Sequence, residues 1–131
     1  TLDSLKLIRK VQAAAEKINH PMAILLQVNA GNDPAKYGFK IEESAFALDE
    51  ILKSSHLLIE GLMTIAPYSP DDLSVARKCF DQLAELRESL HESHGVSLDE
   101  LSMGMSDDLV HAIAAGSTMI RVGSALFGSR R

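Results

Sequence analysis

Short apolar runs alternate with amphipathic helical patterns along the whole chain, and this alternation restricts the fold more than any other feature. A continuous apolar run bounded by turn residues is typical of a buried strand, whereas an apolar residue at every third or fourth position is typical of a helix facing a core. Strands that alternate with helices predict a parallel sheet covered by helices. The predicted strands are Ala23–Val28, Leu57–Ile65, Leu101–Met105 and Thr118–Val122.

The helical segments are bounded by capping and turn residues. The first apolar stripe runs from Leu5 to Ile18, with Asp3 or Ser4 as its predicted N-cap residue. The continuous apolar character of Ala23–Val28 predicts a strand buried on both faces. The other predicted helices cover the stripe from Ile41 to Leu52, the segment from Asp71 or Asp72 to the stop at Gly95, and Asp107–Ala115.

Two glycine- and serine-containing turns follow the last two predicted strands. They are Gly104-Met105-Ser106 and Gly123-Ser124. Glycine has no Cβ and lets the backbone approach a ligand, and Ser106 is the predicted N-cap of the short helix. Turns and helix N-termini with free N–H groups bind phosphate well. The sequence therefore predicts a phosphate cradle between the two turns. Gly61, inside the second strand, predicts close packing or a nearby ligand.

Composition limits the class of protein. The 131 residues are enough for one domain, and 46% apolar with 24% charged residues is ordinary for a globular protein. A net charge of −5 argues against nucleic acid or an anionic membrane as partner. The single cysteine, Cys79, excludes an internal disulfide, and we expect it to be a packed thiol. With no membrane-spanning run and no signal peptide in the sequence, a cytoplasmic location is expected.

Four strand–helix units leave two architectures open. A closed (β/α)8 barrel takes about 250 residues, so this chain forms either an open four-stranded sheet or half of a barrel.

Several sequence blocks carry a resemblance to a known family. They are Thr1–Ser4, Leu26–Asn29, Lys36–Gly38, Gly61–Ile65, Leu101–Asp108 and Gly116–Gly128. Together they resemble the second half of the pyridoxal-phosphate homeostasis proteins of the YggS/PROSC type, whose barrel is similar to the N-terminal domain of alanine racemase. The resemblance implies an α/β fold with parallel strands. On this reading, residues 1–131 are a single domain, the C-terminal half of a (β/α)8 TIM-type barrel with strands five to eight and their helices.

The resemblance also implies a cofactor site at the C-terminal strand ends. Pyridoxal 5'-phosphate (PLP) is the implied cofactor, with Met105, Ser106, Gly123 and Ser124 holding its phosphate. Arg121 is implied to face the pyridine nitrogen. A guanidinium cannot give up its proton, so the ring nitrogen stays unprotonated and the ring is a weaker electron sink. Such a site suits a carrier or racemase-like chemistry.

One departure from the family is large. The family's Schiff-base lysine lies at the end of the first barrel strand, and none of the seven lysines here, from Lys6 to Lys78, matches that motif. We therefore expect phosphate binding without covalent attachment of PLP by this chain. The expected partner is the missing N-terminal half-barrel or a second copy of the chain, because an open half-barrel exposes strand edges and inward side chains, including Met63 and Met103.

Three functions remain open at this point: a PLP carrier, a racemase-like or other phosphate-binding enzyme, and a half-barrel without ligand. No catalytic residue and no metal site are predicted. Arg121 has the alternative of an ion pair with a carboxylate at the barrel mouth, and Lys36 that of an exposed loop lysine. His91 and His94 have a spacing that could bind metal, but we interpret them as solvated side chains near a helix end.

Overall fold

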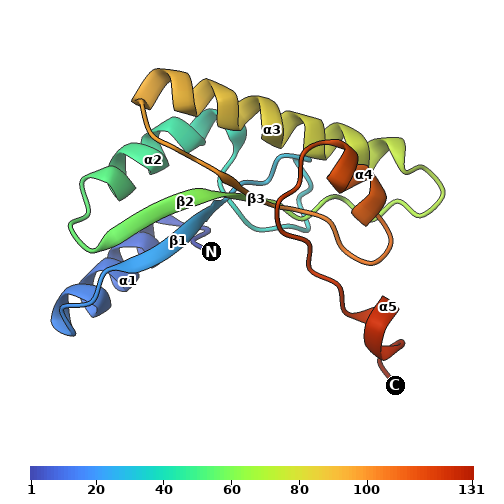
Figure 1. Cartoon of the computed structure of the whole chain (residues 1–131), viewed down its shortest axis with the longest axis horizontal. Helices are drawn as coiled ribbons and strands as arrows, with labels where there is room; N and C mark the ends of the chain where they lie inside the picture. The colour runs from blue at the N-terminus through green and yellow to red at the C-terminus, as the bar shows by residue number, and fades with distance from the viewer.

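Helices and parallel strands alternate along the chain in a computed structural model that describes all residues 1–131 (Figure 1). None of the helices combines the length and the apolar character that crossing a membrane requires. The elements in chain order are α1 (Leu5–Lys17), β1 (Met22–Gln27), the 3-10 turn η1 (Ile41–Glu43), α2 (Ser44–Leu52), β2 (Leu57–Met63), α3 (Ser74–His94), β3 (Glu100–Ser102), α4 (Leu109–Ala114) and α5 (Ser124–Phe127).

The three strands form one parallel sheet in the order β1-β2-β3. Isolated parallel bridges extend it on either side: Leu2 pairs with Leu26 of β1, Phe39 pairs with Val28 just after β1, and Met119 pairs with Ser102 of β3. The segments at Leu2, β1, β2, β3 and Met119 therefore lie side by side in the order of the chain. The predicted α/β fold with parallel strands is confirmed.

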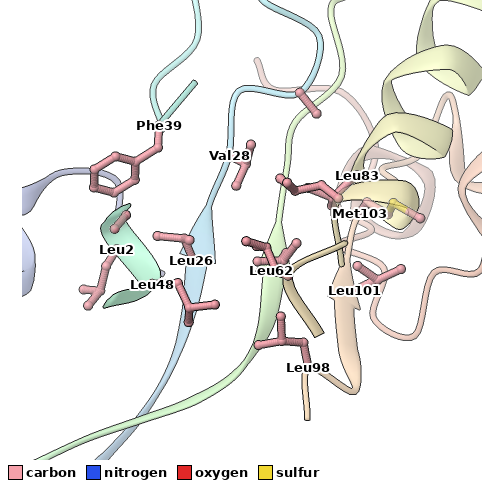
Figure 2. Close-up of a cluster of buried hydrophobic side chains, with 14 of the residues drawn as sticks. Leu2, Leu26, Val28, Phe39, Leu48, Leu62, Leu83, Leu98, Leu101 and Met103 are labelled. Carbon is pink, nitrogen blue, oxygen red and sulfur yellow. The ribbon is translucent and has the colours of Figure 1, made fainter. Parts of the chain in front are cut away.

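The hydrophobic core lies between the sheet and its helices. Leu26 and Leu62, from neighbouring strands, are fully buried and meet Leu48 of α2 and Leu83 of α3 in one cluster (Figure 2). Burying one leucine side chain stabilises a fold by about 1.5–3 kcal/mol, so this cluster is the main source of stability. Figure 1 shows α2 and α3 lying together along one side of the strands.

The face of β1 that points away from α2 and α3 is more exposed than the sequence predicts. Ile24 and Leu26 are buried, whereas Leu25 and Gln27 between and beyond them are partly exposed. The prediction of a strand buried on both faces is wrong, because helices cover only one face of this sheet. The strand therefore follows the alternating pattern of a one-sided sheet.

The last predicted strand, Thr118–Val122, is not a regular strand. It runs beside β3, where the Met103 N–H donates to the Met119 carbonyl at 3.0 Å and the Arg121 N–H donates to the Gly104 carbonyl at 2.9 Å. After the bridge at Met119, the Arg121 N–H pairs with the Gly104 carbonyl and not with the Met103 carbonyl that a regular parallel ladder would use. The pairing slips by one residue at Gly104, which has φ 101°, so no continuous ladder forms. β3 is also shorter than predicted and ends at Ser102.

The predicted caps at the start of α1 and at the end of α3 are confirmed, whereas the start of α3 differs from the prediction. The Ser4 hydroxyl accepts the Leu7 N–H at 3.2 Å, and Gly95 ends α3 in the left-handed region with φ 63°. α3 begins at Ser74, later than predicted. Both the N–H and the hydroxyl of Ser74 donate to the Asp72 carboxylate, which lowers the pKa of Asp72 and holds this segment in a turn.

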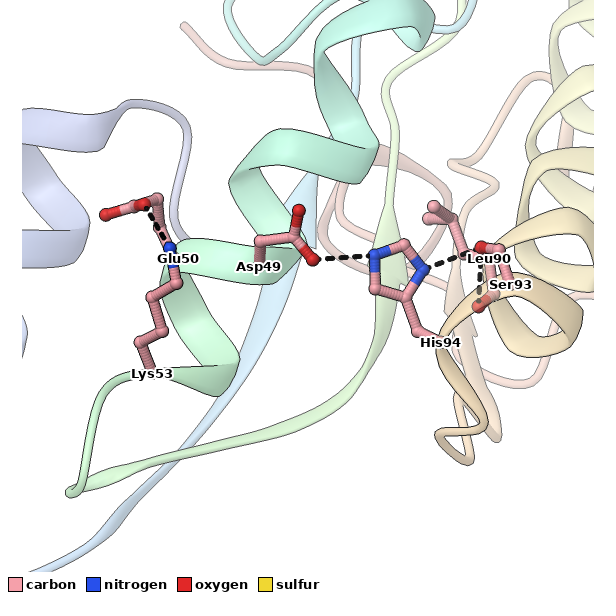
Figure 3. Close-up of polar contacts among 6 residues, drawn as sticks. All are labelled: Asp49, Glu50, Lys53, Leu90, Ser93 and His94. Atoms are coloured by element: carbon pink, nitrogen blue, oxygen red, sulfur yellow. Dashed lines mark hydrogen bonds and ion pairs between the residues drawn. The ribbon is translucent and has the colours of Figure 1, made fainter.

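The prediction that the His94 side chain is solvated is wrong. Its side chain is only 13% exposed, and Nε2 lies 2.9 Å from Oδ1 of Asp49, which joins the end of α3 to α2 (Figure 3). Nδ1 of His91 lies 2.6 Å from the Val96 carbonyl oxygen. Both histidines therefore have structural partners, and the structure contains no group of three or more histidine, cysteine or acidic residues placed to hold a metal ion.

Gly61 marks a close approach of backbones. A Cβ built on it would overlap the carbonyl oxygen of Glu100 in β3. The register between β1 and β2 also shifts immediately before this position, between Ile24 and Leu25. The close-packing interpretation of Gly61 is confirmed.

Replacing Gly61 with alanine is expected to destabilise the fold by about 1–3 kcal/mol, because β3 must move to admit the methyl group. Chemical denaturation measures this loss. Gly123→Ala is the matched control, since a Cβ there meets no atom within 4 Å. Equal stability of the two variants would contradict the packing argument.

Cys79 of α3 lies in the hydrophobic core. Its side chain is buried, and Sγ lies 3.8 Å from the Thr64 hydroxyl, which donates to the Val28 carbonyl at 2.7 Å. Burial raises the pKa of the Cys79 thiol to about 11. The prediction of a packed thiol is confirmed.

The thiol is expected to react very slowly with a thiol reagent at pH 8 in the native protein, because the thiolate is the reactive form and access is blocked. In denaturant the reaction should become fast. Labelling followed over time by mass spectrometry measures both rates. Fast labelling of the native protein at pH 8 would show that the α3–sheet interface opens readily.

Candidate functional site: a phosphate cradle between two turns

The two turns predicted to form the cradle lie together in space. The Ser106 hydroxyl accepts the Ala125 N–H at 3.1 Å, which links the turn after β3 to the start of α5. Between them is a cavity of about 560 Å³. Four of the five predicted site residues line it, and the full lining consists of Met105, Ser106, Asp107, Gly123, Ser124, Phe127, Gly128 and Arg130.

The backbone of these turns offers unused donors. The N–H groups of Ser106, Gly123 and Ser124 donate to no acceptor in the protein. The Ser106 hydroxyl accepts from Ala125 and keeps its own proton free to donate. Arg130 adds a positive charge to the cavity wall. Clustered N–H groups, hydroxyls and a guanidinium are the donors that a phosphate requires, so the residues present fit a phosphate group.

The turn after β3 is built differently from the sequence prediction. The N-cap residue of α4 is Asp108, and the prediction that Ser106 caps this helix is wrong, because its hydroxyl is engaged with α5 instead. The Met105 N–H donates to Oδ1 of Asp108 at 2.7 Å. Met105 therefore lines the cavity without a free backbone donor.

Arg121 lies outside the cradle cavity. Its Nη1 donates to the Ser102 hydroxyl at 2.6 Å and its Nη2 to the Thr64 carbonyl at 2.9 Å. Burial lowers the pKa of this half-buried guanidinium, and the negative charge of Asp108 opposes that shift. No carboxylate lies within ion-pair distance, so the ion-pair alternative for Arg121 is wrong.

Arg121 reaches the sheet face that the helices leave uncovered. Ser102 lies between Leu101 and Met103, which are both in the helix-side core, so its hydroxyl points to the other face. Met63 pairs with Ser102 and shares that face. Met103 was predicted to point the same way, and this is wrong: Met103 is fully buried on the helix side.

Lys36 lies close to the cradle. It is partly buried and lines a smaller cavity of about 210 Å³, which shares Met105 and Asp107 with the cradle. The smaller cavity also contains Asp108. Asp108 is not among the site residues that the sequence predicts. The pair of acidic residues that follows Ser106, Asp107 and Asp108, is the sequence feature that could have pointed to it.

Comparison with known proteins places the chain in a family. Residues 1–131 match the family described as the alanine racemase N-terminal domain. The chain belongs to this family. The match covers the whole chain, including both turns of the cradle.

Relatives of this family agree with the resemblance to pyridoxal-phosphate homeostasis proteins. The chain is 36% identical over 131 residues to the pyridoxal phosphate homeostasis protein of Pasteurella multocida, covering 99% of this chain and 56% of the relative. PipY of Synechococcus elongatus, solved with PLP bound, matches with a TM-score of 0.87 and 31% identity, covering 97% of this chain and 58% of PipY. The resemblance is confirmed, and the chain spans little more than half the length of these relatives.

A more distant solved structure shares the fold. Alanine racemase of Clostridium difficile matches with a TM-score of 0.78 and 20% identity, covering 98% of this chain and 33% of that one. The parallel arrangement of strands and helices is thus common to the homeostasis proteins and to the racemase, whose TIM-barrel-like domain it matches.

Proposed function

We propose that this chain binds PLP by its phosphate and serves intracellular PLP homeostasis. The observation that carries the proposal is that Ser106, Gly123 and Ser124 line one cavity and that their N–H groups donate to no acceptor in the protein. PipY, a relative of similar fold, binds PLP. The alternative of a racemase-like enzyme rests on likeness of fold alone.

The proposal includes a place in a barrel. Leu2, β1, β2, β3 and Met119 mark five neighbouring parallel segments in chain order. This arrangement supports the end of a fourth strand followed by strands five to eight. Residues 1–131 would then form one half-barrel domain, with the cradle after strands seven and eight, where barrels often bind phosphate.

In this arrangement Arg121 is proposed to contact the pyridine ring of PLP. Its guanidinium is on the uncovered face and is oriented by Ser102 and the Thr64 carbonyl. Because a guanidinium keeps its protons, it would donate to the ring nitrogen and leave that nitrogen unprotonated. Bound PLP supplies an electron-withdrawing ring to its protein, and this contact weakens that property, which suits a carrier.

We propose that this chain holds the phosphate without a covalent bond to PLP. No lysine lines the cradle cavity, and Lys36 belongs to the neighbouring one. The family's Schiff-base lysine belongs to the first half of the barrel. The half formed by residues 1–131 is therefore proposed to contact the phosphate and the ring only.

The cradle is tested by Gly123→Val. A side chain at Gly123 meets no protein atom within 4 Å, so it should fill the ligand space and leave the fold intact. We expect PLP and inorganic phosphate to bind at least about tenfold more weakly, because the valine side chain would prevent one or more charge-assisted hydrogen bonds to the phosphate. Titration calorimetry measures the affinity, and the unfolding midpoint confirms the fold. Undiminished binding would rule the cradle out.

The uncovered face and the free edges are proposed to bind the remaining half of a barrel. Leu58 on β2 is 55% exposed, and Met119 and Ile120 on the outer segment are 44% and 41% exposed. Phe127 of α5 is 87% exposed, and Figure 1 shows α5 standing away from the other elements. Unpaired strand edges bordered by apolar side chains favour pairing with another chain.

The purified 131-residue chain is therefore expected to self-associate when no other half is present. Light scattering measures its mass in solution, and adding a separately expressed first half-barrel from a homologue should convert it into a one-to-one complex. A monodisperse 14.2 kDa species with cooperative unfolding would contradict the half-barrel proposal and favour a self-sufficient open sheet.

A further inference from the structure

Asp108 makes an unusual contact for a residue at the start of a helix. It is the N-cap residue of α4, but its side chain makes no hydrogen bond to the N–H groups of that helix. Instead Oδ1 reaches back three residues and accepts the Met105 N–H at 2.7 Å. The carboxylate is therefore used to shape the preceding turn, which is the turn that lines the cradle.

The contact between Asp108 and Met105 is reciprocal. The Asp108 N–H donates to the Met105 carbonyl at 3.2 Å, while the Met105 N–H donates to the Asp108 carboxylate. These two hydrogen bonds close a loop whose outer residues are Ser106 and Asp107. Gly104, with φ 101°, lets the chain enter this loop directly from the end of the β3 segment.

The closed loop determines which of its backbone donors are occupied and which are free. It occupies the Met105 N–H internally and leaves Ser106 at the tip, where its hydroxyl meets the Ala125 N–H and its own N–H stays free. If the Asp108 carboxylate were removed, the loop would lose the stronger of its two closing bonds, since hydrogen bonds to a charged acceptor are roughly twice as strong as neutral ones.

The same carboxylate places a negative charge beside an anion site. Asp108 is close enough to Arg121 to act on it electrostatically, and Asp107 lines the cradle cavity itself. Like charges repel, so these carboxylates reduce the affinity for a phosphate dianion. Asp108 therefore has two opposite effects on phosphate affinity: its hydrogen bond holds the loop in the binding shape and raises the affinity, and its negative charge lowers it.

We propose that Asp108 is the positioning residue of the cradle, holding the Gly104–Asp108 loop in its phosphate-binding shape while its charge keeps the affinity for phosphate moderate. The proposal rests on the proposed phosphate site. A site with this balance holds a phosphate ligand and also releases it, as a carrier must.

Two substitutions separate shape from charge. Asp108→Asn keeps an oxygen that accepts the Met105 N–H and removes the charge, so inorganic phosphate and PLP should bind about threefold to tenfold more tightly. Asp108→Ala removes the charge and the hydrogen bond, and binding should become about tenfold weaker than in the unmodified chain. The gain in Asp108→Asn should shrink as salt is raised, which a purely structural effect would not do.

Asp107 provides the matched control. It is the neighbouring carboxylate, it lines the same cavity, and its side chain has no hydrogen bond in the structure. Asp107→Asn and Asp107→Ala should therefore tighten phosphate binding to the same extent. If Asp108→Ala also tightened binding as Asp108→Asn does, the positioning role would be overturned.

Hydrogen exchange tests Asp108 independently of any ligand. The Met105 N–H should be protected in the unmodified chain and in Asp108→Asn, and exposed in Asp108→Ala. Rapid exchange of Met105 in the unmodified chain would overturn the inference even if phosphate binds. Protection of Met105 in a chain that binds neither phosphate nor PLP would instead contradict the proposed function and leave the loop-closing role of Asp108 standing.

Discussion

The one-sided contact between the sheet and its helices is the constraint on which the rest of this structure depends. Alternate residues of β1 and β2, such as Leu26 and Leu62, meet Leu48 and Leu83 on the helix side. Ser102, which lies between the buried Leu101 and Met103, points to the other face together with its strand neighbour Met63. The face that binds no helix therefore carries Arg121.

The segment from Thr118 to Val122, at the end of the sheet, is held beside β3 largely by side-chain hydrogen bonds. The chain from Thr118 to Val122 has a strand neighbour on one side only, and it is held by a bridge at Met119 and by side chains. The Thr118 hydroxyl accepts the Leu101 N–H at 2.8 Å, and Arg121 reaches across β3 to the Thr64 carbonyl. Polar side chains thus replace part of a missing ladder, and they bring the second turn next to the first.

The candidate site is held by single hydrogen bonds between short loops. One bond joins Ser106 to Ala125, and a reciprocal pair joins Met105 to Asp108. Loops carried by a packed scaffold often provide binding groups, because their backbone donors are not consumed by regular structure. The Ser124 N–H is free because Ser124 is the first residue of α5, where helical N–H groups have no acceptor, and the N–H groups of Ser106 and Gly123 lie in turns outside any ladder.

Local chemistry in the sequence determined the types of the predicted elements other than the strand Thr118–Val122, the Ser4 and Gly95 caps, the close approach at Gly61 and the grouping of four cradle residues in two turns. These depend on side-chain periodicity, on backbone freedom and on parallel strand order, all of which are encoded locally. Only the tertiary structure decided that one sheet face stays uncovered, that His94 pairs with Asp49, that Met103 points into the helix-side core and that Asp108 binds Met105. Each of these depends on which segments meet in space, and a carboxylate or an imidazole has the same local sequence signal whether it meets solvent, a distant helix or the preceding turn.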